Sequence, residues 1–136
     1  MILIVDSYAW IEFLIGSEQE PQVREALSAA DVVVTPDLVL AEITRKFFRE
    51  GVAPSQIRRR VEDLSTLSQI TPITIDIALG IFEADSDLRK RARSRKLKNP
   101  GIADAVILST TRWLKGRVLT ADPHFEGLPE TLWLEL

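Results

Sequence analysis

Four acidic residues in this 136-residue sequence stand within or directly behind apolar runs. They are Asp6, Glu42, Asp104 and Asp122. Asp6 ends the run Ile-Leu-Ile-Val, and Asp104 interrupts the run Gly-Ile-Ala-Asp-Ala-Val-Ile-Leu. A carboxylate in such surroundings is expected to be partly buried, and burial of a charge is unfavourable unless the charge has a partner. These acids are therefore candidates for ligand binding or catalysis.

The apolar pattern around them predicts an α/β fold with a mainly parallel sheet. Four consecutive apolar residues at 2–5 are typical of a strand that is covered on both faces. Further strands are expected at 32–34, 71–75, 118–120 and 132–134. Helices are expected at 7–15, 20–29, 37–50, 54–67, 76–98 and 102–115. Strands that alternate with helices indicate βαβ units, here in a single domain over residues 1–136.

This topology would bring the four acids to one edge of the sheet. Asp6 and Asp122 follow strands and lie at their carboxyl ends. The helix after the second strand starts at the same edge, which places Glu42 within two turns of it. The helix before the fourth strand also starts there, and Asp104 is in its first turn. Ligands of open α/β sheets bind at this edge.

A cluster of carboxylates needs something to offset its repulsion. Two unit charges about 4 Å apart repel by about 4 kcal/mol at an effective dielectric constant near 20. Shared protons would reduce this repulsion, and so would a divalent cation. The sequence has no cysteine and one histidine, which favours Mg²⁺ or Mn²⁺ over zinc or copper. Such a metal activates water and stabilises phosphodiester hydrolysis, so we expect a metal-dependent phosphodiesterase.

Each acid also has an ordinary structural role to be weighed against this one. Asp6 could cap a helix, although Ser7 is available as the N-cap. Glu42 has Lys46 four residues later, at the spacing of a surface ion pair. Asp122 precedes a proline, as in many turns. Together, these alternatives require independent coincidences at all four acids.

Composition limits the class of protein. A hydrophobic fraction of 46% without any long apolar run excludes a membrane-spanning helix. The sequence starts on a predicted strand, without the pattern of a signal peptide, and we expect a cytoplasmic protein. The net charge of −3 argues against a uniformly basic surface that coats nucleic acid, although it allows a local basic patch.

One segment is strongly basic and leads into the helix of Asp104. Its candidate RNA-binding residues are Arg89, Arg91, Arg93, Arg95, Lys96 and Lys98. An acidic pocket that acts on a polyanion needs such a counter-charge, and binding through it should weaken with salt. The alternative is a solvated end of the long helix.

The acids and their neighbours resemble the PIN-domain ribonucleases, in particular the VapC-type toxins of toxin–antitoxin pairs. The matching motifs are Asp6-Ser7, Leu40-Ala41-Glu42-Ile43-Thr44, Ala103-Asp104-Ala105 and Val118-Leu119-Thr120-Ala121-Asp122-Pro123-His124-Phe125. The resemblance covers the whole chain and implies a three-layer α/β/α sandwich. It implies Mg²⁺- or Mn²⁺-dependent RNA cleavage with the four acids as metal ligands and catalytic residues. It further implies Ser7 and Thr120 as supporting hydroxyls, a homodimer and a VapB-type antitoxin.

Two positions depart from the family pattern. Tyr8 stands where a small or hydroxyl residue is frequent, and His124 stands where many relatives carry another acid. The second departure leaves the number of metal ions open, and we assign no catalytic role to His124.

Two other classes of protein also place acids at strand ends. A haloacid-dehalogenase-like phosphatase needs a second aspartate two residues after Asp6, where Tyr8 stands, and a receiver domain pairs two acids after its first strand. Both are disfavoured. A non-catalytic module that binds a basic peptide at the acidic edge remains the alternative to the nuclease.

Overall fold

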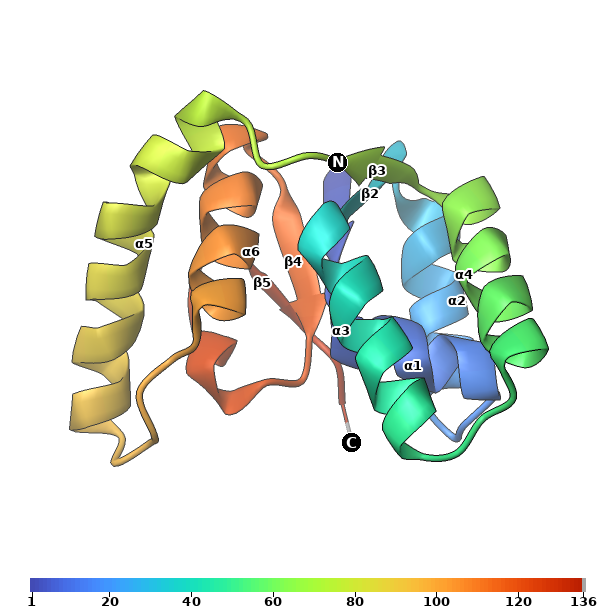
Figure 1. Ribbon diagram of the computed structural model, residues 1–136. Helices are drawn as coiled ribbons and strands as arrows, with labels where there is room; N and C mark the ends of the chain where they lie inside the picture. Colours follow the sequence, from blue (N-terminus) through green and yellow to red (C-terminus); the bar gives the residue numbers. More distant parts are fainter. Residues whose placement is uncertain (136) are drawn as a thin grey trace.

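The sheet of this protein is entirely parallel. The computed structural model describes residues 1–135, and within them the strands pair in the order β3-β2-β1-β4-β5 (Figure 1). They are β1 (Ile2–Val5), β2 (Val32–Pro36), β3 (Gln69–Thr71), β4 (Arg117–Thr120) and β5 (Thr131–Trp133). Because β1 is the central strand, Leu3, Ile4 and Val5 are fully buried. This position explains the unbroken apolar run that precedes Asp6.

Helices cover both faces of the sheet, which confirms the predicted α/β/α sandwich. They are α1 (Ser7–Ile15), α2 (Glu20–Ala29), α3 (Asp37–Arg49), α4 (Pro54–Leu67), α5 (Ile75–Ser94), α6 (Ile102–Trp113) and the short 3₁₀ helix η1 (Pro123–Phe125). Figure 1 shows α5 and α6 on one side of the sheet, with α5 outermost, and α1 to α4 on the other side. None of the helices within residues 1–135 has the length and hydropathy of a membrane span.

The indole of Trp10 attaches α1 to the sheet. Its ring is fully buried, and its Nε1 donates to Thr35 Oγ1 of β2 over 2.9 Å. The Thr35 hydroxyl lies 2.7 Å from Ser68 Oγ, next to β3. Asp6 directly follows β1 and caps α1. Its position is therefore fixed both by the strand and by the helix that Trp10 attaches to the sheet.

The third strand is earlier in the chain than the sequence predicts. We expected it at 71–75, whereas β3 ends at Thr71 and α5 starts at Ile75. Pro72 has no N–H to donate to a neighbouring strand. Thr74 then acts as N-cap, because its hydroxyl accepts from the Ile77 N–H over 3.2 Å. These two residues end the strand and start the helix.

Helices α5 and α6 lie close together at Gly80. The hydroxyl of Ser109, in α6, donates to the Ile77 carbonyl of α5 over 2.6 Å. A Cβ atom built on Gly80 would lie only 2.5 Å from the same hydroxyl oxygen. Glycine is therefore needed at this contact between α5 and α6, the helix that carries Asp104.

We expect Gly80→Ala to destabilise the protein by about 1–3 kcal/mol, because the new methyl group displaces the buried Ser109 hydroxyl. In the double variant Gly80→Ala with Ser109→Ala, the oxygen is absent and alanine favours the helix. The double variant should therefore be at least as stable as Ser109→Ala alone. Urea unfolding of wild type, the two single variants and the double variant measures this. An equal loss of stability from Gly80→Ala with serine and with alanine at position 109 would contradict it.

Candidate active site

The structure places the four acids at the carboxyl edge of the sheet. Among the described residues, only Asp104 and Asp122 of the four belong to a group whose ligand atoms lie close enough together to hold one metal ion. Asp6 directly follows β1, and Asp122 lies two residues after β4. Glu42 projects from α3, and Asp104 lies in the first turn of α6. Burial raises the pKa of Asp6, Glu42 and Asp104, and the charges of neighbouring acids of the set raise each of these values further.

Asp6 is the most deeply buried of these acids, with 5% of its surface exposed. Its Oδ1 accepts from the Ala9 N–H over 2.9 Å, so that Asp6 caps α1 and Ser7 is the first helical residue. Its Oδ2 accepts from the hydroxyl of Thr120. Burial raises the pKa of Asp6 to about 7, although both hydrogen bonds lower it. The acid thus combines the capping role with a place in the cluster.

Thr120 joins two of the acids. Its buried hydroxyl donates to Asp6 and accepts from the Asp122 N–H over 2.9 Å. Because β1 and β4 are neighbours in the sheet, this one hydroxyl fixes the position of Asp122 relative to Asp6.

Glu42 has no salt bridge within residues 1–135. Lys46, which the spacing suggested as its partner, lies 3.5 Å from Glu50 instead. Burial raises the pKa of Glu42, and the charge of Asp104 raises it further, whereas Arg45 and the Ser7 hydroxyl lower it. Within the described chain, Glu42 Oε1 is buried without a hydrogen-bond partner. A buried oxygen of this kind is rare in proteins and indicates a missing partner.

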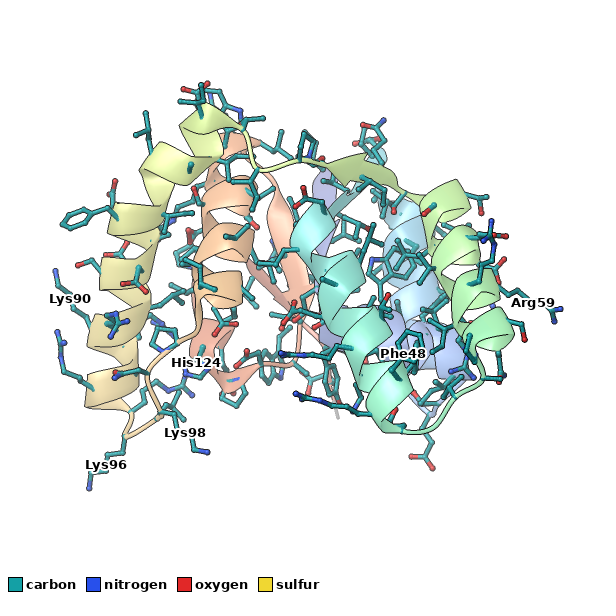
Figure 2. The ribbon with its side chains drawn as sticks, viewed as in Figure 1. Phe48, Arg59, Lys90, Lys96, Lys98 and His124 are labelled. Atoms are coloured by element: carbon teal, nitrogen blue, oxygen red, sulfur yellow. The ribbon has the colours of Figure 1, made fainter. Side chains whose placement is uncertain are left out.

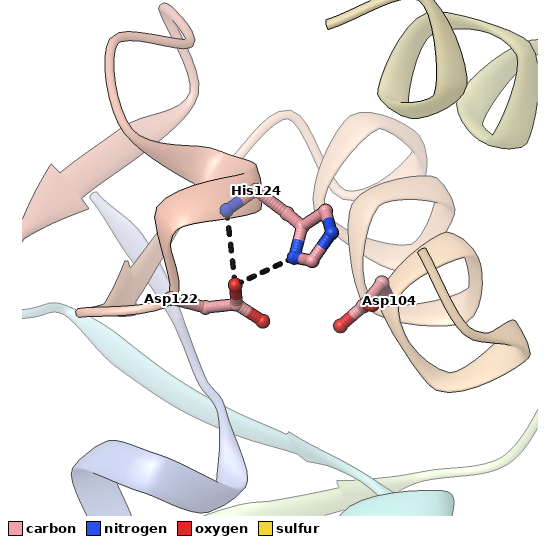
Figure 3. A group of neighbouring side chains, drawn as sticks. All are labelled: Asp104, Asp122 and His124. Atoms are coloured by element: carbon pink, nitrogen blue, oxygen red, sulfur yellow. Dashed lines mark hydrogen bonds and ion pairs between the residues drawn. The ribbon is translucent and has the colours of Figure 1, made fainter. Parts of the chain in front are cut away.

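Asp104, Asp122 and His124 offer ligand atoms that all lie within 4.8 Å of one another. Figure 3 shows these side chains around a common space between α6 and η1. Asp122 Oδ1 accepts from the His124 N–H and lies 2.9 Å from His124 Nδ1. Asp104 Oδ2 accepts from the Gly101 N–H over 2.9 Å and so also caps α6.

His124 belongs to the site, although its sequence context alone did not assign it a role. Its Nε2 lies 2.7 Å from the Lys98 carbonyl oxygen, which only accepts, so this nitrogen carries a proton. Burial lowers the pKa of His124, but the Lys98 carbonyl and Asp122 outweigh this effect and the net pKa is raised. The signal in the sequence is the spacing Asp-Pro-His, in which the aspartate accepts from the N–H two residues later.

The basic segment is only partly available to a ligand. Arg89 pairs with Asp85 over 2.7 Å, while Arg91 and Arg95 donate to the chain at Glu126. Arg93, Lys96 and Lys98 are exposed. Figure 2 shows Lys90, Lys96 and Lys98 pointing away from the body of the protein, on the side of His124.

A second basic surface lies beside Glu42. A groove of about 360 Å³ is lined by Ser7 and Glu42 together with three cations of α3. These cations are Arg45, Lys46 and Arg49. The acidic cluster thus has positive charge near it on both α3 and the end of α5.

The donor set fits a divalent cation of the hard type. The four acids offer carboxylate oxygens, one of which, Glu42 Oε1, lacks a hydrogen-bond partner in the described chain. Asp6, Glu42 and Asp104 hold protons more strongly than usual because their pKa values are raised, and a cation would replace those protons. Mg²⁺ and Mn²⁺ prefer such oxygen ligands.

The PIN domain family matches residues 3–130 of the sequence, nearly its full length. The chain belongs to the PIN-domain family. This PIN domain is accordingly a nuclease-type protein, and the four acids of the cluster fall within the matched region. A comparison with the curated proteins finds no match.

Solved structures have the same fold over almost their whole length. A toxin–antitoxin complex from Klebsiella pneumoniae contains a chain with 21% identity and a TM-score of 0.70, covering 96% of this chain and 95% of that one. VapBC2 from Rickettsia felis, bound to a promoter DNA fragment, contains a chain with 15% identity and a TM-score of 0.72. The match covers 98% of this chain and 97% of that one. VapC20 from Mycobacterium tuberculosis, described as a sarcin–ricin loop cleaving toxin, has 18% identity and a TM-score of 0.69. The match covers 94% of this chain and 95% of that one.

The raised pKa of Asp6 predicts how stability depends on pH. The unfolded residue loses its proton near 3.8 and the folded residue near 7. Between these values only the folded state holds the proton, so stability falls as pH rises. Asp6→Asn cannot ionise. In EDTA at about pH 8 we expect this variant to be roughly 2–4 kcal/mol more stable than wild type.

The difference between Asp6→Asn and wild type should shrink towards about pH 4, where the folded and unfolded forms of Asp6 both approach the protonated state. Urea unfolding across this range measures it, with Asp63→Asn on the exposed surface of α4 as the control. A constant difference across the range would contradict the assignment of the pH dependence to Asp6.

Proposed function

We propose that this PIN domain is a divalent-metal-dependent endoribonuclease that hydrolyses RNA phosphodiester bonds. The observation that carries the proposal is Glu42 Oε1, a buried oxygen without a hydrogen-bond partner in residues 1–135, on an acid whose pKa the charges of Asp104 and Asp122 raise. Mg²⁺ or Mn²⁺ would be held by Asp6, Glu42, Asp104 and Asp122. When bound, the metal supplies a more acidic water and stabilises charge on the phosphate.

The other residues of the site hold these ligands in place. We propose Thr120 as a support, because its hydroxyl contacts both Asp6 and the Asp122 N–H. Ser7 supports Glu42, since its hydroxyl favours the ionised form of that acid. His124 contacts Asp122 through Nδ1, and its Nε2 donates to the Lys98 carbonyl. Because both ring nitrogens have partners within the chain, His124 orients the Asp122 carboxylate and does not transfer protons to RNA.

We further propose that the protein is the toxin of a VapBC-type pair, acts in the cytoplasm and is inhibited by a VapB-type antitoxin. The support is the fold shared with the Klebsiella complex and with VapBC2 from Rickettsia felis. RNA is favoured as substrate because the similar VapC20 is described as cleaving the sarcin–ricin loop. The exposed cations of α3 and of the end of α5 provide counter-charge for a polyanion.

The central test compares wild type with Asp104→Asn on mixed cellular RNA in Mg²⁺, Mn²⁺ or EDTA. Asparagine keeps an oxygen that can accept from the Gly101 N–H, so the cap of α6 persists. We expect EDTA to abolish cleavage and Asp104→Asn to slow it by roughly 100-fold or more, because it removes a ligand charge. Asp63→Asn, a matched change on α4, should cleave like wild type.

Undiminished cleavage by Asp104→Asn would overturn the nuclease assignment. If wild type neither cleaves RNA nor binds Mn²⁺ in a calorimetric titration, and instead binds a basic peptide tightly, the non-catalytic binding module is the correct function.

We also propose that the protein forms a homodimer through the outer face of α5. Ile75, Leu79 and Phe82 are 79%, 74% and 85% exposed, and their spacing places them on one side of the helix. Helix α5 is therefore apolar on two sides, because Ile77 and Leu88 face the core. Exposed apolar stripes of this size are typical of interfaces.

Charge along α5 favours a second copy of this chain as the partner. The first half of the helix carries Asp76 and Glu83, and the second half carries Lys90. Two copies of α5 packed antiparallel about a two-fold axis would bring each acidic half beside a basic half. A helix of 20 residues is about 30 Å long, which suits an interface of roughly 800 Å² per partner.

We expect Phe82→Ser to shift the protein from dimer to monomer in light scattering after size-exclusion chromatography. Phe48→Ser, which removes a 54% exposed phenylalanine from α3 (Figure 2), should leave the dimer intact. Asp76→Lys should weaken the dimer roughly tenfold by opposing Lys90 of the partner, and Lys90→Asp in the same chain should restore it. A wild-type monomer at micromolar concentration would contradict the proposal.

A further inference from the structure

The end of α5 holds the turn that carries Asp122. Arg91 Nη2 donates to the Glu126 carbonyl. Arg95 Nη1 donates to the carbonyls of Pro123 and Glu126 over 3.1 and 3.0 Å, and its Nη2 donates to Glu126 Oε2 over 2.7 Å. One guanidinium thus contacts both ends of the turn that follows the fourth acid.

A further contact ties the same turn to the chain just beyond α5. His124 Nε2 donates to the Lys98 carbonyl over 2.7 Å, and His124 Nδ1 lies 2.9 Å from Asp122 Oδ1. From the sheet side, the turn is fixed by Thr120, whose hydroxyl accepts from the Asp122 N–H. Asp122 is therefore held between β4 and the segment 91–98.

We propose that Arg95, assisted by Arg91, is a positioning residue that keeps Asp122 beside Asp104. This inference rests on the proposed function, because it assigns a purpose to the geometry of the proposed metal ligands. A planar guanidinium suits the task, since its N–H groups form a rigid fork that reaches several acceptors at once. The exposed ion pair with Glu126 adds little by itself; the contacts with the turn carbonyls are the ones that fix the backbone.

This role differs from the RNA contact that the basic segment suggests. The N–H groups of Arg95 already point to two carbonyls and a carboxylate of the chain. Arg93 lies two residues earlier, in the last turn of α5, is exposed and carries the same charge. Contact with RNA phosphates is assigned to Arg93 and Lys96 instead, and the position of Asp122 to Arg95.

The first test measures Mn²⁺ binding by calorimetry for wild type, Arg95→Ala, Arg95→Lys and the matched control Arg93→Ala. We expect Arg95→Ala to weaken Mn²⁺ binding and to slow cleavage of mixed cellular RNA, each by roughly 10–100-fold, as for other residues that orient metal ligands. Arg95→Lys should recover part of the loss, because an ammonium group can still reach a carbonyl. Arg93→Ala should bind Mn²⁺ like wild type.

The second test separates positioning from RNA contact. In the Asp104→Asn background, filter binding of labelled cellular RNA is measured against salt concentration. Loss of one phosphate contact reduces the slope of the logarithm of the binding constant against the logarithm of salt by about 0.7–0.9. We expect this reduction for Arg93→Ala and not for Arg95→Ala. The opposite result, together with unchanged Mn²⁺ binding by Arg95→Ala, would overturn the inference.

Amide hydrogen exchange tests the same contact without metal or RNA. The N–H groups of Phe125 and Leu128 bond within the turn over 2.9 and 3.2 Å. They should exchange faster in Arg95→Ala than in Arg93→Ala, and equal rates would count against the inference. If exchange changes as expected but wild type neither binds Mn²⁺ nor cleaves RNA, the proposed function fails while the contact of Arg95 with the turn stands.

Discussion

Repulsion among partly buried carboxylates is the constraint on which the rest of this structure depends. Asp6 tolerates its burial because it accepts two hydrogen bonds and because its raised pKa lets it hold a proton near neutrality. The Thr120 hydroxyl and the caps of α1, α6 and η1 fix the acids before any ligand arrives. The site is thus arranged in advance at a cost in stability, as expected where binding or catalysis requires the arrangement.

Much of this arrangement could be predicted from the sequence, because it depends on patterns local to each element. Apolar runs predicted the buried strands, and parallel topology predicted that acids after β1 and β4 would share an edge. The position of β3 could not be found in the same way, since Ile73 and Ile75 are as apolar as a strand requires. There the backbone preferences of Pro72 and Thr74 decided the outcome.

Contacts between segments far apart in the chain could not be predicted from the sequence. The bond between His124 and the Lys98 carbonyl joins residues 26 positions apart. The contact of Arg95 with Glu126 spans 31 positions. In the sequence, these cations are part of a charge run that is equally suited to RNA, and only the fold distinguishes Arg95 from Arg93. Family membership identifies the type of protein, whereas identities of 15–21% with solved structures establish the fold alone.

Helix α5 has a consequence for how this chain can vary. Its inner face packs on α6, its outer face carries exposed apolar residues, and its end contacts the turn of Asp122. Each residue of an α-helix advances by about 100° around the axis. A single insertion in the middle of α5 would therefore rotate the guanidinium of Arg95 away from its carbonyls even if the core face before it stayed in place. The length of this helix is thus as constrained as its composition, and length variation should be confined to the loops that flank it.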